Sequence, residues 1–174
     1  MSAGPPIPSV DTLLTTLATD LQQLLTQRGI TDPLLVGIHT GGVWVAERLL
    51  TRLSLPGPLG SLDISFYRDD FTRIGMNPEV KPSHLPFALD NRQVILVDDV
   101  LHTGRTIRAA LNELFDYGRP AGVLLAVLVD RSGRDLPIQA DVAGLQLDLG
   151  PREHVKLVGP DDLQLVFHQV APRP

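Results

Sequence analysis

The 174-residue sequence contains no cysteine and only two lysines, Lys81 and Lys156. Without cysteine, the chain can form neither a disulfide nor a thiolate metal site. The longest continuous apolar run, residues 123–129, is far shorter than the roughly 20 residues that a membrane-spanning helix needs. The first residues also lack the basic and apolar stretches of a secretory signal. We therefore expect a cytoplasmic protein without membrane segments.

The charge balance is mildly acidic, with a net charge of −5. This balance argues against nonspecific binding to nucleic acid, but it is compatible with a local basic face built of arginine. The hydrophobic fraction of 43% is typical of a globular protein, and the length suits one domain with a sizeable core. We predict a single domain over residues 1–174, in which residues 1–8 form a proline-rich tail.

Apolar periodicity predicts an α/β protein. A helix is expected to begin after Ser9, a suitable N-cap, and to end near Gly29. The alternation of strands and helices favours a mostly parallel sheet with helices on both faces. The predicted strands are residues 34–38, 62–67, 94–97 and 122–129, followed by short strands or hairpins within residues 142–149, 154–158 and 163–167.

Two further helices are predicted from apolar positions that recur at helical spacing. Each begins directly after a glycine-containing loop that follows a buried strand. The expected core positions of the first are Val45, Ala46, Leu49, Leu50 and Leu53, and those of the second are Ile107, Ala110, Leu111, Leu114 and Phe115.

The two loops, residues 39–42 and residues 98–106, point to a ligand that carries phosphate. The free N–H groups at the start of a helix, together with the helix dipole, favour an anion. Both loops follow strands of the predicted parallel sheet, so they should lie at the same edge. One such loop is a weak signal, whereas two at one edge indicate a ligand rich in phosphate.

The second loop has the more distinctive chemistry. Its strand ends in two carboxylates, Asp98 and Asp99, while Thr103, Arg105 and Thr106 add hydroxyl groups and a positive charge. Carboxylates accept hydrogen bonds from sugar hydroxyls and are suitable ligands for Mg²⁺. A sugar 5-phosphate would therefore suit both halves of the loop.

The stretch from residue 72 to residue 86 shows no periodicity and is interrupted by glycine and proline. A loop of this length in a compact domain is commonly a lid or a binding loop, and the alternative is a plain surface excursion. Its basic residues Arg73, Lys81 and His84 would be able to reach an anionic ligand.

Residues 94–106, Val-Ile-Leu-Val-Asp-Asp-Val-Leu-His-Thr-Gly-Arg-Thr, resemble the binding signature for 5-phosphoribosyl diphosphate (PRPP) of type I phosphoribosyltransferases. Within that superfamily the chain is similar to the PyrR family of pyrimidine-operon regulators. The segments that carry this narrower resemblance are residues 62–70, 105–110, 116–120, 128–131 and 136–138.

The resemblance implies a type I phosphoribosyltransferase fold, which has a mostly parallel sheet flanked by helices, a small hood and a mobile loop. It also implies two functions, namely uracil phosphoribosyltransferase activity, which converts uracil and PRPP to UMP and diphosphate, and attenuation control through a leader RNA. Mg²⁺ is the implied cofactor, and a homo-oligomer, a dimer or larger, is the implied assembly.

The resemblance further assigns roles to individual residues. Asp98, Asp99 and Arg68 would be catalytic, Arg131 and Val155 would lie on the base side, and Mg²⁺ would bind through PRPP and through Asp98 or Asp99. The implied PRPP site consists of Thr40, Gly41, Asp98, Asp99, Val100, Leu101, His102, Thr103, Gly104, Arg105 and Thr106.

Four departures from the family pattern stand out. Gly41 replaces an arginine that many members carry, and His102 stands where an aromatic residue is usual. Residues 132–135 and 146–151 differ from the corresponding family segments, and these changes remove basic and polar groups from the region associated with RNA. Three functions stay open at this stage: a uracil phosphoribosyltransferase, an RNA-binding regulator that senses UMP with little catalysis, and a phosphoribosyltransferase for another base.

Overall fold

The computed structural model describes residues 6–65 and 83–172. Five parallel strands form one sheet in the order β2-β1-β3-β4-β5, and two antiparallel strands, β6 and β7, form a second sheet. The elements are α1 (Val10–Gln27), β1 (Leu34–Ile38), α2 (Gly41–Arg52), β2 (Gly60–Leu62), β3 (Gln93–Leu101), α4 (Arg105–Asp116), β4 (Gly122–Arg131), β5 (Val142–Leu147), β6 (Glu153–Val158) and β7 (Gln164–Gln169).

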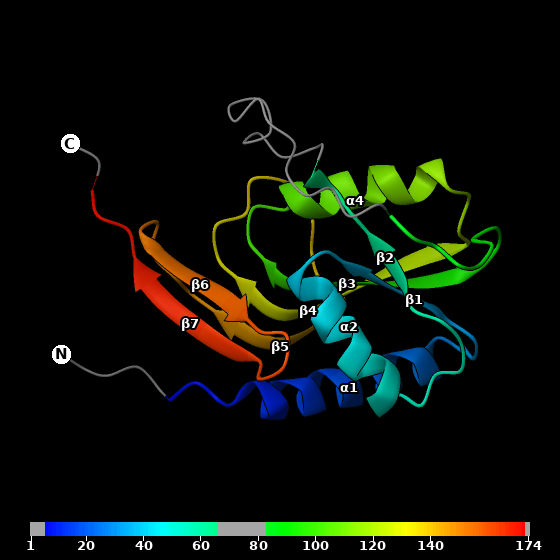
Figure 1. Ribbon diagram of the computed structural model, residues 1–174, viewed down its shortest axis with the longest axis horizontal. Coiled ribbons are helices and arrows are strands. Elements are labelled where there is room, and N and C mark those ends of the chain that lie inside the picture. The colour runs from blue at the N-terminus through cyan, green and yellow to red at the C-terminus, as the bar shows by residue number, and fades with distance from the viewer. Residues whose placement is uncertain (1–5, 66–82, 173–174) are drawn as a thin grey trace.

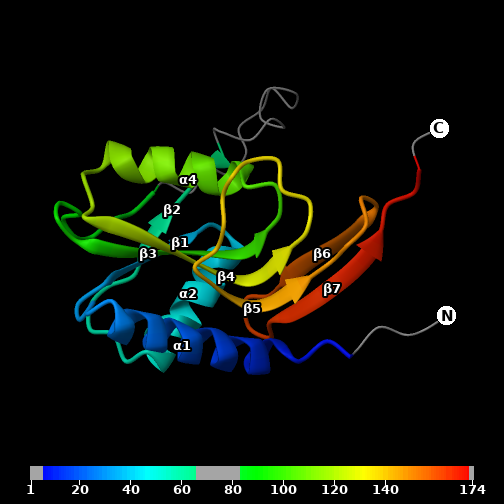
Figure 2. The same ribbon diagram turned by 180° about the vertical axis from the view of Figure 1, so that it is seen from behind.

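The layers are those of an α/β protein. Helices α1 and α2 cover one face of the large sheet and α4 covers the other, whereas β6 and β7 lie at the end toward which the strands point (Figures 1 and 2). We call β6, β7 and the turn between them the hood. The predicted fold class, a mostly parallel sheet flanked by helices with a small hood, is confirmed.

Helix α1 forms as its sequence predicts. The hydroxyl oxygen of Ser9 accepts a hydrogen bond from the backbone N–H of Thr12 at 3.2 Å, which satisfies one of the unpaired donors at the helix start. Gly29 follows the helix in a left-handed conformation with φ +65°. The apolar face of the helix is buried against the sheet, and it consists of Val10, Leu13, Leu14, Leu17, Ala18, Leu21 and Leu25.

The central strand β3 divides the core into two halves. Successive side chains of a strand point to opposite faces of its sheet. Accordingly, Ile95 and Val97 belong to the apolar cluster beneath α1 and α2, while Val94 and Leu96 belong to the cluster beneath α4. All four side chains are fully buried, as predicted for a strand covered on both faces.

Three strand predictions were wrong in their bounds, and the simplest case is the strand expected at residues 122–129, since β4 continues to Arg131. The strand expected at residues 62–67 is β2, Gly60–Leu62, which ends because the carboxylate of Asp63 accepts a hydrogen bond from the N–H of Ser65 at 2.9 Å and turns the chain. Strand β3 continues past residue 97 to Leu101, because its backbone still pairs with β4 there. The acidic pair therefore lies inside the strand rather than after it.

The prediction that Phe115 faces the core was also wrong, since this residue is 53% exposed. Phe115 follows Ile107 by eight positions, and it therefore points about 80° away from the direction of the buried Ile107 side chain. Leu114 lies close to the direction of Ile107 and is fully buried.

The predicted loop at residues 72–86 lies mostly outside the described residues, and so do Arg73 and Lys81. Its last part is described, and the backbones of His84 and Ser61 exchange two hydrogen bonds of 2.8 Å. Over the described ranges, no helix is both long and apolar enough to cross a membrane. The extent of the predicted tail and single domain stays a prediction.

Replacing Leu17 with alanine should test the packing of α1. The side chain is fully buried, so its removal leaves a cavity and should lower the free energy of unfolding by about 3 kcal/mol. Urea denaturation measures this change. Thr16→Ala, at an exposed position of the same helix, is the control and should change stability by less than about 0.5 kcal/mol. Equal losses in the two variants would contradict the packing described for α1.

Candidate active site

The two predicted phosphate loops lie side by side. Strands β1 and β3 are parallel neighbours with Gly37 paired to Val97, so the segments that follow them meet at the carboxyl edge of the sheet. Residues 39–42 lead into α2, and residues 102–104 lead into α4. Both helices therefore direct their N-terminal N–H groups toward this edge, as the sequence predicted.

The start of α2 is packed directly against the acidic pair. A Cβ atom on Gly41 would overlap the carboxylate of Asp99, and a Cβ atom on Gly42 would lie 2.6 Å from the backbone oxygen of Val97 and 3.2 Å from Oδ1 of Asp98. A side chain at position 42 would meet the backbone of β3, whereas one at position 41 would meet only the side chain of Asp99, which would have to turn away. Glycine at position 41 therefore leaves room for the carboxylate of Asp99 in its present orientation.

The carboxylates of the acidic pair are held by their own backbone. Oδ1 of Asp98 accepts from the N–H of Asp99 at 2.8 Å, and Oδ1 of Asp99 accepts from the N–H of Val100 at 2.7 Å. Asp98 is 5% exposed. Because neighbouring residues of a strand point to opposite faces, Asp99 lies on the side of α2 and Asp98 on the side of α4.

The loop between β3 and α4 is shaped by hydrogen bonds and by one glycine. The hydroxyl oxygen of Thr103 accepts from the N–H of Arg105 at 3.2 Å. Gly104 has a φ of +95°, which favours glycine, and a Cβ atom there would lie 3.3 Å from Cβ of Ile138. The side chain of Arg105 is 61% exposed and is paired with Asp135 at 3.5 Å.

The segment after β4 supports this loop from behind. The backbone oxygen of Thr103 accepts from the N–H groups of Asp135 and Leu136, at 2.9 and 3.0 Å. Arg134 donates to the backbone oxygen of His102 and pairs with the buried carboxylate of Asp130 at 2.7 Å. We had not identified Arg134 as a site residue from the sequence, and its spacing of four residues from Asp130 is the only signal that could have indicated it.

His102 lies in a cationic environment. Burial of the imidazole lowers its pKa below the ordinary value of 6.5, and the nearby charges of Arg131, His154 and Arg134 lower it further, against an opposing effect of Asp135. The ring also lies close to Gly133, where an added Cβ atom would be 2.9 Å from Nε2 of His102. His102 is therefore neutral at neutral pH.

Arg131 is buried, with 4% exposure, at the end of β4. Its guanidinium donates to the backbone oxygens of Glu153 at 2.7 Å, Ser132 at 3.3 Å and Gly150 at 3.4 Å. It thus holds the start of the hood, two residues before Val155. The structure places these two base-side candidates near each other, and their contact with a base stays a prediction.

The remaining predicted site residues differ in how accessible they are to a ligand. Leu101 is 1% exposed, so only its backbone is available to a ligand. Val100 is partly buried and packs against the core cluster that contains Leu157 of the hood. Thr40 precedes α2 and is exposed, and its peptide bond with His39 is cis. Arg68 lies outside the described residues.

The oxygen ligands at this edge suit Mg²⁺. Asp98 and Asp99 supply carboxylate groups, which this ion prefers. In residues 6–65 and 83–172, no three histidine, cysteine, aspartate or glutamate side chains are grouped so that they could hold a metal by themselves. A magnesium ion here would therefore take its other ligands from substrate oxygens and water.

Residues 9–161 match the phosphoribosyl transferase domain family. A protein of Nitrosococcus oceani named "Bifunctional protein PyrR" is 60% identical over 166 residues, which cover 94% of either chain. A protein of the same name from Pseudomonas paraeruginosa is 58% identical, over 95% of this chain and 98% of its own. The chain belongs to the PyrR family of phosphoribosyltransferases. The resemblance found in the sequence is confirmed.

Solved structures of more distant phosphoribosyltransferases share the fold of this PyrR-family chain. A hypoxanthine-guanine phosphoribosyltransferase from Bacillus anthracis has a TM-score of 0.65 at 17% identity, over 89% of this chain and 87% of its own. A hypoxanthine phosphoribosyl transferase from Trypanosoma cruzi has a TM-score of 0.63 at 21% identity, over 84% and 80%. The type I phosphoribosyltransferase fold is thereby confirmed.

The lowered pKa of His102 should make stability depend on pH. The folded state disfavours the proton, whereas the unfolded chain takes it up as the pH falls through about 6.5, so stability should decrease below that pH. Urea denaturation at pH 7.5 and 5.5 should show a smaller loss for His102→Gln than for the wild type. His84→Gln, at an exposed position, is the control and should follow the wild type. A parallel loss in all three proteins would refute the assignment.

Proposed function

We propose that this protein transfers a phosphoribosyl group from PRPP to uracil, giving UMP and diphosphate. The observation that carries the proposal is the arrangement of two glycine-containing helix starts on either side of an acidic pair, in a chain of the PyrR family. A donor with a phosphate at one end and a diphosphate at the other matches such a pair of anion sites.

Each part of the donor has a candidate partner. The loop from Thr103 to Thr106 and the first N–H groups of α4 would bind the 5-phosphate, helped by the charge of Arg105. Thr40, Gly41 and the start of α2 would bind the diphosphate. The backbone of residues 100–102 would lie along the ribose between these two groups, because β3 leads from the acidic pair toward the loop.

The reaction breaks the bond between C1′ of the ribose and the diphosphate oxygen and forms a bond from C1′ to N1 of uracil, which loses its proton. Positive charge develops on the ribose as the leaving group departs. The carboxylates of Asp98 and Asp99, which would accept hydrogen bonds from the ribose hydroxyls, are placed to stabilise that charge. Neutral uracil is a weak nucleophile, so positioning contributes much of the rate.

The family also uses a metal cofactor. Bound Mg²⁺ would neutralise diphosphate charge, with Asp98 or Asp99 as a protein ligand. Arg131 and the backbone of Val155 would form one wall of the base site. Arg68 is a third catalytic candidate, beside Asp98 and Asp99. A homo-oligomer and a cytoplasmic location stay predictions.

Asp98→Asn and Asp99→Asn should each lower the rate of UMP formation by about two orders of magnitude, because the amide removes negative charge next to the ribose. The measurement is conversion of labelled uracil with PRPP and Mg²⁺. Asp116→Asn, at the exposed end of α4, is the matched control and should leave the rate unchanged.

The same assay should include hypoxanthine, guanine and orotate in place of uracil. A wild-type enzyme that used one of these bases and not uracil would overturn the choice of substrate while leaving the phosphoribosyl transfer intact. No product from any base would overturn the catalytic assignment.

Regulation of pyrimidine genes is the second candidate function, favoured by curated relatives that carry the word "Bifunctional" in their name. We expect the protein to bind the leader RNA of its pyrimidine genes more tightly in the presence of UMP. Filter binding at 150 mM salt compares this RNA with a scrambled sequence of equal length, because affinity for nucleic acid depends strongly on salt. Equal affinity for the two RNAs would rule out this function.

A further inference from the structure

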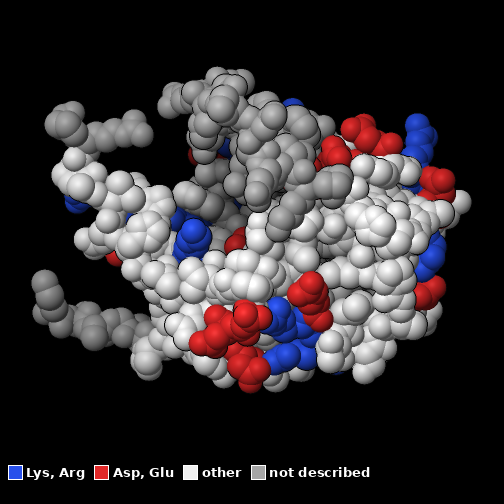
Figure 3. Space-filling model, in the orientation of Figure 1, with Lys and Arg blue, Asp and Glu red and all other residues white. Residues whose placement is uncertain are grey.

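Helix α2 touches the site at its first turn and the hood at its later turns. Its first turn carries Gly41, which lies against the carboxylate of Asp99. Its middle carries Trp44 and Arg48, which contact the turn between β6 and β7. Figure 3 shows basic and acidic side chains gathered where α1, α2 and this turn meet, on the lower part of the face in view.

Arg48 provides the polar half of the contact with the hood. One of its terminal nitrogens donates to the backbone oxygen of Pro160 at 2.6 Å and reaches that of Asp161 at 3.5 Å. The other donates to the backbone oxygen of Trp44 at 3.3 Å, which fixes the guanidinium along the helix. The side chain is 26% exposed, so this is a partly buried, charge-assisted contact.

Trp44 provides the apolar half. A Cβ atom on Gly159 would lie 3.1 Å from Cε3 of the indole, so the turn passes directly over the ring. Trp44, Leu163 and Leu165 pack against the core cluster that contains the buried Leu157 of β6. The turn of the hood is therefore seated on α2 by both hydrogen bonds and apolar packing.

The opposite end of β6 is held by a different arginine. Arg131 of β4 donates to the backbone oxygen of Glu153, the first residue of β6, at 2.7 Å. Pro160, which Arg48 holds, follows the last residue of this strand by two positions. Val155, the residue whose backbone would bound the base site, lies between the two anchors.

We propose that Arg48 is a positioning residue that sets the place of the hood over the diphosphate loop and thereby the fit of the base. This inference rests on the proposed phosphoribosyl transfer to uracil. Helix α2 is the rigid link: its start binds the diphosphate, and Arg48, two turns later, fixes the strand that bounds the base. Arg48 does not touch either substrate, so its loss alters base binding and leaves donor binding in place.

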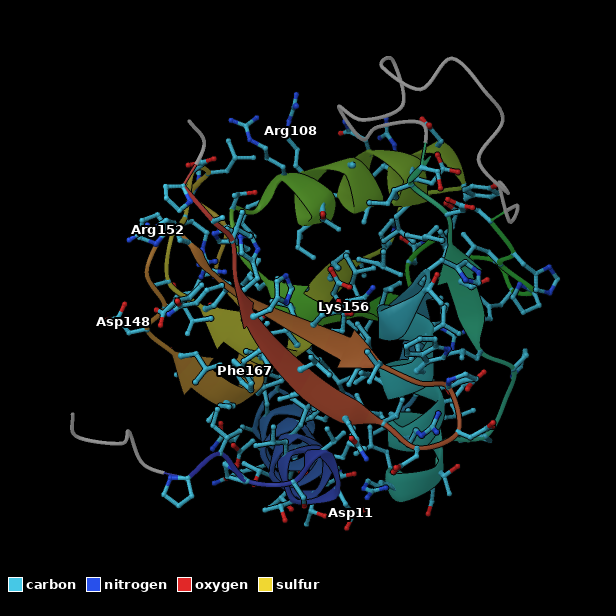
Figure 4. All side chains as sticks on the ribbon, turned by 60° about the vertical axis from the view of Figure 1, so that its left-hand side comes forward. Asp11, Arg108, Asp148, Arg152, Lys156 and Phe167 are labelled. Carbon is cyan, nitrogen blue, oxygen red and sulfur yellow. The ribbon has the colours of Figure 1, made fainter. Side chains whose placement is uncertain are left out.

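The test compares Arg48→Met with Arg52→Met. Arg52 lies on the same helix, and its side chain is 27% exposed, against 26% for Arg48. It pairs with Asp11 at the start of α1 instead of with the hood (Figure 4). Arg48→Met should raise the KM for uracil about tenfold, the effect of losing hydrogen bonds from a charged donor. The KM for PRPP and the kcat should stay within twofold of the wild type. Arg52→Met should leave all three unchanged, and Arg48→Lys should recover part of the loss.

Hydrogen exchange gives a readout that needs no turnover. Amides of residues 153–169 should exchange at least fivefold faster in Arg48→Met than in Arg52→Met or the wild type, while those of α1 should not change. Unaltered exchange in the hood, an unaltered KM for uracil, or an equal rise in the KM values of both substrates would overturn the proposal. If the wild type formed no UMP, the proposed function would fail, and the exchange measurement would still decide whether Arg48 holds the hood.

Discussion

The contact between the first glycines of α2 and the acidic end of β3 is the constraint on which the rest of the site depends. A Cβ atom on Gly42 would meet the backbone of β3, and a Cβ atom on Gly41 would meet the carboxylate of Asp99 as it now lies. Two helix starts are thereby fixed on either side of one pair of carboxylates. Such an arrangement suits a ligand with anionic ends and a sugar between them. The parallel sheet makes this possible, since it brings both loops to one edge.

Most of the fold could be predicted because its signals are local. The leucine stripe of α1, its Ser9 cap and the apolar strands read directly from spacing, and the structure agrees. The continuation of β3 to Leu101 could not be read in this way. Its polar residues break the apolar pattern, whereas the strand continues because its backbone is paired with β4. The exposure of Phe115 was missed because its angular position, and not its hydrophobicity, decides it.

The residues of the candidate site likewise differ in whether local sequence signals could predict their roles. The loop from His102 to Thr106 is one continuous segment, so a phosphate-binding role for it could be predicted from residue types and spacing. Arg48 could not be recognised, and Arg134 could be indicated only by its spacing from Asp130, because the two side chains act on positions 112 and 32 residues away. Both donate to backbone oxygens, and a backbone oxygen leaves no mark in the sequence of the partner. Arg108 of α4, by comparison, extends away from the sheet (Figure 4).

Because Arg48 and Arg131 donate to backbone oxygens of the hood, these contacts place few demands on the side chains at the accepting positions. A carbonyl group is present whatever the side chain, so the hydrogen bonds from Arg48 and Arg131 do not depend on which side chains stand at positions 160 and 153. The seating of Gly159 on Trp44 and the burial of Leu157, by contrast, do depend on the residues at those positions of the hood.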